Sequence, residues 1–153
     1  MAPKLVSGIG IIGLGLIGGS FARALKLNNS VDIVLGFDIR KAEMDTAVRL
    51  NVIDVACDSI EDLVVKSQVI VLAAPVKAVE PILRNMAPHI TEQHIITDMG
   101  SVKGAVIDIF KVHFNELMPR FVPGHPIAGS EKSGVAESDP ALFQNHKTIL
   151  TPS

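Results

Sequence analysis

The stretch GIGIIGLGLIGGS, Gly8 to Ser20, contains six glycines and decides the fold of this chain. It lies in an uncharged run from Leu5 to Ala22, which is about the minimum length of a membrane span and, with Lys4 in front, also resembles a secretory signal. Each interior glycine costs a helix about 1 kcal/mol relative to alanine, so this density favours a turn. The order of residues predicts a buried strand over Ile9 to Ile12, the glycine turn, and a helix over Ser20 to Leu27.

The turn has the spacing of a dinucleotide-binding site, with Gly13, Gly15 and Gly18 forming G-x-G-x-x-G. In that motif Gly13 permits the tight turn, Gly15 lets the backbone approach a diphosphate, and Gly18 lets the helix pack closely on the strand. Leu16 and Ile17 belong to the same turn, and the N-terminus of the helix that follows it faces the phosphates. The motif alone is weak evidence, because other αβ proteins also contain glycine-rich turns.

An acidic residue stands where the dinucleotide pattern requires one. The apolar run Ile33 to Phe37 ends at Asp38, 25 residues beyond Gly13, where a carboxylate would bind the ribose hydroxyls of the adenosine. Asp38 favours NAD over NADP because it would repel a ribose phosphate, although Arg40 could soften that preference. An ordinary loop carboxylate or a helix cap remains the alternative for Asp38.

The composition fits one globular domain over residues 1–153. The net charge of −2 gives no reason to invoke nucleic acid or an anionic membrane, whereas the hydrophobic share of 48% is high. Cys57 is the single cysteine, and no Cys or His spacing suits a metal, so we expect a reduced, cytoplasmic setting. The acidic neighbours of Cys57 should raise its thiol pKa, which argues against a thiol nucleophile.

The rest of the chain alternates between strand and helix patterns. Ser59 is expected to cap a helix, with Asp62 three residues on, and Pro81 is expected in the first turn of another. Further strands are expected over residues 52–56, 69–73, 95–98, 120–122 and 148–150, and helices over 41–50, 59–66, 78–86 and 102–117. This alternation predicts an α/β fold: a doubly wound, mainly parallel, Rossmann-type sheet with a ligand crevice at the carboxyl ends of its strands.

Two stretches that follow predicted strands contain the candidate chemistry. Residues 98–104 join a strand to a helix, and Ser101 is placed there as an N-cap beside the crevice, a role that could be all it has. Residues 125–131 place His125 beside a turn of small residues and a carboxylate, where it could act as a general base or be purely structural. His113 lies at helical spacing and is expected to be packed or interfacial, and the other histidines are expected to be surface or packing residues: His89, His94 and His146.

Together these motifs resemble the prephenate dehydrogenases, which include arogenate and cyclohexadienyl dehydrogenases. The resemblance runs from about Gly8 to Pro152, and Met99 departs from it where Val or Gln is expected. Four stretches carry it, the last being the most specific: Gly13 to Ser20, Ala73-Ala74-Pro75-Val76, Asp98 to Gly104, and Gly124 to Gly134.

The resemblance implies NAD-dependent oxidative decarboxylation of prephenate to 4-hydroxyphenylpyruvate in tyrosine biosynthesis. It implies that His125 accepts a hydrogen bond or proton from the ring hydroxyl, that Ser101 positions that hydroxyl, His125 and the nicotinamide, and that Glu131 lies at the substrate entrance. The cofactor site it implies comprises Gly13, Gly15, Leu16, Ile17, Gly18, Asp38, Arg40, Ala73, Ala74, Pro75 and Ser101.

Family members continue into a helical second domain that forms the dimer and supplies an arginine for the substrate. The chain is therefore expected to be the cofactor domain of a longer homodimeric enzyme. Its excess apolar residues are expected on the face that the helical second domain covers. Arogenate dehydrogenase and a stand-alone NAD-binding module remain alternatives, since the fold does not establish function. A hydroxyacid dehydrogenase of the 6-phosphogluconate type shares the glycine turn but does not predict the motif that begins at His125. The sequence does not separate prephenate from arogenate or reveal feedback by tyrosine.

Overall fold

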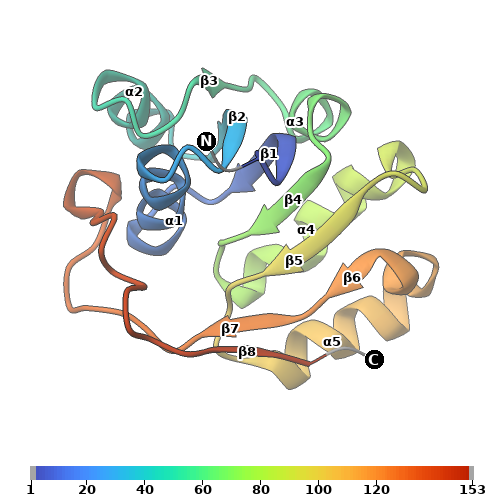
Figure 1. Ribbon diagram of the computed structural model, residues 1–153. Helices are drawn as coiled ribbons and strands as arrows, with labels where there is room; N and C mark the ends of the chain where they lie inside the picture. The colour runs from blue at the N-terminus through green and yellow to red at the C-terminus, as the bar shows by residue number, and fades with distance from the viewer. Residues whose placement is uncertain (1–2, 152–153) are drawn as a thin grey trace.

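The computed structural model describes residues 3–151 and is built on a six-stranded parallel sheet (Figure 1). The strand order is β3-β2-β1-β4-β5-β6, and every neighbouring pair is parallel. The order reverses between β1 and β4, which opens a crevice at the carboxyl ends of these two strands. This architecture confirms the predicted doubly wound sheet. Its strands are β1 (Val6–Ile12), β2 (Val31–Phe37), β3 (Val55–Ala56), β4 (Val69–Leu72), β5 (Ile95–Asp98) and β6 (Phe121–Val122).

Helices cover both faces of the sheet and enclose two separate cores. In β1, Ile9 and Ile11 belong to the core on one face of the sheet, whereas Ile12 belongs to the core on the other face. This alternation follows from the two-residue period of a strand that is buried on both faces. One face carries α1 (Leu16–Leu27) and α2 (Lys41–Arg49), and the other carries α3 (Ile60–Lys66), α4 (Val76–Met86) and α5 (Lys103–His113).

The glycine-rich stretch forms strand, turn and helix, as predicted. The helix begins at Leu16, four residues earlier than the expected start at Ser20. Gly10, which precedes the turn, has a packing role, since a Cβ there would overlap Leu63 and Ser67 and push α3 away from β1. Across the described residues, no helix combines the length and the apolar character needed to cross a membrane.

Two predicted elements differ in detail. The helix expected from residue 78 begins at Val76 because Pro75 serves as its N-cap, so Pro81 is the sixth helical residue and not part of the first turn. Having no N–H, Pro81 cannot bond the carbonyl of Lys77, one turn earlier. The strand expected over residues 52–56 is reduced to β3. The predicted cap of α3 is confirmed, since the Asp62 N–H donates to Ser59 Oγ at 3.0 Å.

The C-terminal strands were predicted less well. β8 (Thr148–Leu150) does not extend the parallel sheet, because it pairs antiparallel with β7 (Gly124–Pro126), a strand that the sequence did not predict. The helix expected to reach Leu117 ends at His113, where Phe114 leaves helical geometry. His113 is exposed with its ring edge near Phe114, so it is not packed in the core, and of the two expected roles only the interfacial one stays a prediction. The 3₁₀ turns are η1 (Ala87–His89), η2 (Asn115–Arg120) and η3 (Val135–Glu137).

Candidate functional site

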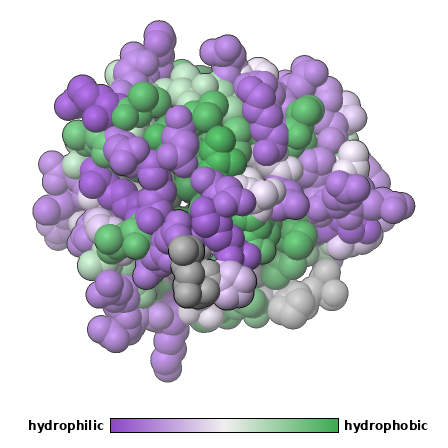
Figure 2. All heavy atoms as spheres, turned by 45° about the horizontal axis from the view of Figure 1, so that its top comes forward, coloured by the Kyte–Doolittle hydropathy of each residue, from purple (hydrophilic) through white to green (hydrophobic). Residues whose placement is uncertain are grey.

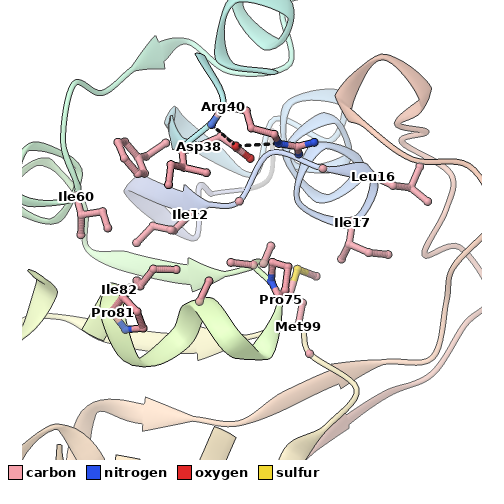
Figure 3. Close-up of a pocket in the computed structure, with 18 of the residues that line it drawn as sticks. Ile12, Leu16, Ile17, Asp38, Arg40, Ile60, Pro75, Pro81, Ile82 and Met99 are labelled. Carbon is pink, nitrogen blue, oxygen red and sulfur yellow. Dashed lines mark hydrogen bonds and ion pairs between the residues drawn. The ribbon is translucent and has the colours of Figure 1, made fainter. Parts of the chain in front are cut away.

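A pocket of about 1290 Å³ lies at the crevice between β1 and β4 (Figure 3). This volume exceeds that of a typical drug-sized site and suits an extended ligand. The structure brings together nine of the residues predicted to bind a cofactor, all of which line this pocket: Gly13, Gly15, Leu16, Ile17, Asp38, Arg40, Ala73, Ala74 and Pro75.

The glycine turn has the geometry that the motif requires. Gly13 adopts a φ of +101°, and a Cβ there would lie 2.6 Å from the carbonyl oxygen of Ala73. A Cβ at Gly18 would overlap the carbonyl of Gly13, so Gly18 serves the close packing of helix on strand and does not line the pocket. Gly15 is different, because no atom lies within 4 Å of a Cβ placed there. Gly15 is also the N-cap of α1, so the open space beside it fits a phosphate group at a helix N-terminus.

Asp38 is held rigidly at the end of β2. Its side chain is 7% exposed, its Oδ2 accepts the Leu14 N–H at 2.8 Å, and its Oδ1 accepts the Arg40 N–H at 2.8 Å (Figure 3). The Arg40 guanidinium lies 3.4 Å from Oδ1 and is mostly exposed. The carboxylate thus stands at the pocket with spare acceptor capacity for hydroxyl groups, next to the exposed Arg40 guanidinium.

Apolar side chains form the end of the pocket that is farther from the glycine turn. Ile60, Pro81 and Ile82 extend into it from α3 and α4, beside Ile12 at the end of β1 (Figure 3). Such a surface suits a flat, uncharged ring. His89 also lines this end, which the sequence gave no signal for, and its Nε2 lies 3.8 Å from Glu61.

Asp98 ties the two candidate catalytic stretches together, a role that sequence reasoning missed. The residue is 3% exposed, its Oδ1 accepts the Gly124 N–H at 3.1 Å, and its Oδ2 accepts the Gly100 N–H at 3.2 Å and the Lys103 ammonium group. Gly100 precedes Ser101, and Gly124 precedes His125. The available signal was an acid ending an apolar strand with a lysine five residues on.

Ser101 and His125 lie on neighbouring elements but outside the large pocket. Ser101 is exposed and lines a smaller cavity of about 140 Å³ with Ala74 and Pro75. It is not the N-cap of α5 as predicted; that position is Val102, because the helix begins one residue later, at the lysine that binds Asp98. His125 is half-buried in β7, paired with Ile149.

Glu131 lies on a loop whose neighbours reach the pocket. Gly129, Ser130 and Lys132 line the pocket, whereas Glu131 is exposed and does not. The hydrogen bonds of the described residues include none among Ser101, His125 and Glu131. The structure therefore brings most of the predicted cofactor residues together and leaves the three predicted substrate-side residues without hydrogen bonds to one another.

The remaining histidines and the cysteine have structural surroundings. His94 is buried with its Nε2 3.1 Å from the Val64 carbonyl, and His146 is exposed with its Nδ1 2.8 Å from the Ile127 carbonyl, as expected of packing and surface residues. Burial, followed by the charge of Asp62, raises the pKa of the Cys57 thiol to about 11. Within residues 3–151, no group of three or more His, Cys, Asp or Glu side chains could hold a metal ion.

Comparison with known proteins identifies related chains. Residues 21–153 match the family model described as prephenate dehydrogenase, nucleotide-binding domain. The chain is 40% identical to the prephenate dehydrogenase of Bacillus subtilis over 146 residues, covering 93% of this chain and 38% of that protein. It is also 40% identical to the cyclohexadienyl dehydrogenase of Zymomonas mobilis, covering 94% and 48%.

A solved structure shows the same fold. Prephenate dehydrogenase from Aquifex aeolicus, in complex with hydroxyphenyl propionate and NAD+, superposes with a TM-score of 0.86 and 38% identity. The match covers 96% of this chain and 51% of that one. The chain thus spans from two-fifths to one-half of the length of these relatives.

Proposed function

The chain belongs to the prephenate dehydrogenase family through its nucleotide-binding domain, and we propose that it binds NAD for the oxidative decarboxylation of prephenate to 4-hydroxyphenylpyruvate. The observation that carries the cofactor assignment is the buried Asp38 carboxylate, which shares one pocket with the open backbone of Gly15. The related enzyme from Aquifex aeolicus, with NAD+ in its structure, supports the same assignment.

The residues around the glycine turn fit NAD. Asp38 would accept hydrogen bonds from the adenosine ribose hydroxyls, and the first turn of α1 would face the diphosphate. Bound NAD supplies the hydride acceptor of the reaction. His125 would accept the proton of the ring hydroxyl, because negative character on that oxygen promotes hydride loss. The hydride would leave the ring carbon that bears this hydroxyl, and the ring carboxylate would depart as carbon dioxide. Ser101 would orient the hydroxyl, and Glu131 would stand at the substrate entrance.

The helical second domain of the family is part of the proposal. Several exposed apolar side chains lie on or beside the elements that carry Ser101 and His125, namely Val102, Ile127, Ile149 and Leu150. On the face drawn in Figure 2, apolar groups form separate patches between polar ones. We expect the second domain to cover the exposed side chains Val102, Ile127, Ile149 and Leu150, to supply a cation for the substrate, and to form the dimer. We also place the reaction in the cytoplasm, consistent with the single, buried thiol.

Two assays test the proposal. A protein that joins this chain to its helical domain should form NADH from prephenate, whereas the chain by itself should bind NAD, self-associate and turn over negligibly, since orientation and charge complementarity are incomplete. Arogenate is assayed in parallel, because a preference for it would make the protein an arogenate dehydrogenase. Cofactor binding with no turnover of either substrate by the joined protein would favour a stand-alone NAD-binding module. Robust turnover by the chain alone would contradict the domain assignment.

A further inference from the structure

The long segment between β7 and β8 crosses back to the first helix and is fixed there (Figure 1). Val135 is fully buried against the core of that side. Three hydrogen bonds between distant residues hold the segment: Val135 N–H to Glu43 Oε2 at 2.7 Å, Asp139 N–H to Ser20 Oγ at 2.9 Å, and Arg23 Nε to Ser138 Oγ at 2.7 Å. We call this group of contacts, between residues 135–139 and α1 and α2, the latch.

The latch explains a glycine that the dinucleotide motif does not. Gly19 follows the G-x-G-x-x-G pattern, and a Cβ there would lie 3.0 Å from Val135 Cγ2 and 3.0 Å from Ser138 Cβ. Ser20, the next residue, is fully buried and accepts one of the latch hydrogen bonds. The α1 surface that follows the glycine turn is therefore shaped to receive residues 135–139.

The loop that precedes the latch lines the cofactor pocket. Gly129, Ser130, Lys132, Ser133 and Gly134 share this pocket with the glycine turn. The Lys132 side chain is 68% exposed and lies 3.8 Å from Glu137, so its charge is only weakly paired. A diphosphate ligand would bring negative charge to the same pocket.

We propose that the latch holds loop 129–134 over the bound dinucleotide, so that Glu43 and Gly19, which do not line the pocket, are positioning residues for cofactor retention. The identity of the ligand rests on the proposed function. Because the loop lines the same pocket as the glycine turn, a loosened latch frees the cofactor to leave. The effect therefore falls mainly on the dissociation rate.

The test compares variants that break the latch in two different ways. Glu43→Ala removes the acceptor of the Val135 N–H, and Gly19→Ala pushes residues 135 and 138 outward without removing a hydrogen bond. Glu43→Gln keeps an acceptor oxygen and should behave as the parent. The controls are Asp45→Ala, an acid on α2 that is exposed and makes no latch contact, and Gly104→Ala, where a Cβ meets no atom within 4 Å.

The probe is NADH, whose dissociation from the chain is followed by stopped-flow fluorescence. We expect Glu43→Ala to release NADH about tenfold faster, the size of one lost hydrogen bond. Gly19→Ala should also release NADH faster, because its Cβ displaces residues 135 and 138, whereas Glu43→Gln and both controls should match the parent. Trypsin provides a second readout. NADH should slow cleavage after Lys132 in the parent and protect it much less in the two latch variants.

Each outcome separates this inference from the proposed function. A parent chain that binds NADH, with latch variants that release it at the parent rate, would overturn the latch and leave the cofactor assignment intact. A parent that does not bind NADH would overturn both. If Glu43→Ala unfolds, which a thermal melt reveals, Gly19→Ala and its trypsin pattern decide.

Discussion

The parallel sheet and the β7–β8 ribbon are supported in different ways. β1 and β4 have helices on both faces and are buried through their carboxyl-terminal halves, whereas all three residues of β8 are exposed. The glycine turn and Asp38 belong to the first region, and His125 belongs to the second. The difference teaches that the glycine turn and Asp38 are held by a region packed on both faces, while the proposed chemistry rests on a ribbon that the buried carboxylate of Asp98 ties to the sheet.

The largest effect expected is on catalysis, and it would come from the ribbon. In the joined protein, His125→Asn should lower kcat by about 10²–10⁴-fold, the usual contribution of a general base, and change NADH affinity by less than about twofold. His146→Asn, an exposed histidine near the same ribbon, is the matched control. Activity of His125→Asn within a few-fold of the parent would make His125 structural.

A second prediction concerns the tie between the two regions. Asp98→Asn should destabilise the chain by about 3 kcal/mol, because it leaves the mostly buried Lys103 ammonium unpaired. Adding Lys103→Met should recover much of the loss. Asp54→Asn is the control, since Asp54 also accepts hydrogen bonds from a lysine ammonium and a backbone N–H but has no bond to the ribbon. Urea denaturation measures the free energy of unfolding of the parent and the three variants. Equal losses of stability for Asp98→Asn and Asp54→Asn would show that the bond from Asp98 to the ribbon adds no stability of its own.

The sheet region should also be chemically inert where it is buried. The pKa of Cys57 is raised to about 11, so its thiolate forms only at high pH and is about a hundredfold scarcer near pH 8 than in a thiol of pKa 9.0. A colorimetric thiol reagent should therefore label the folded chain far more slowly than the urea-unfolded chain. The same shift makes the folded state lose stability as pH rises above about 9, where only the unfolded thiol ionises. Rapid labelling of the folded chain at pH 8 would contradict the assignment.

The smallest effect expected is on cofactor choice. The chain should bind NAD more tightly than NADP. Asp38→Ser, with Arg40 retained, should reduce the ratio of the two affinities by about tenfold, because it removes a carboxylate that repels the ribose phosphate of NADP. Titration of both cofactors into the parent and the variant measures this. Equal affinities in the parent would remove Asp38 as a determinant of specificity.

The sequence predicted best where its signals are local. The turn at Gly13, the acid at Asp38 and the cap at Ser59 each depend on residues near them in the chain, and all three are where the pattern put them. The predicted place of β8 in the sheet was wrong because a strand pattern does not say which strand is its partner. β7 was not predicted because it contains Gly124 and Pro126, which strands usually avoid.

The site shows the same division. The cofactor residues follow strands whose carboxyl ends meet by topology, so their meeting could be predicted. The buried role of Asp98 could not, because its partners at Gly100 and Gly124 become neighbours only when the loops after β5 and β6 fold back. Ser101 was misplaced as a cap for a related reason, since Lys103 binds Asp98 and the helix begins one residue later than its cap pattern suggests.

The latch has a consequence for the order in which the pocket forms during synthesis. The bond from Leu14 to Asp38 spans 24 residues, whereas the latch bonds span 92, 115 and 119. Contacts between distant residues form late, because long loops must close first. The glycine turn and its acid can fold while the chain is still being made, but the loop over the cofactor waits until Asp139 has left the ribosome.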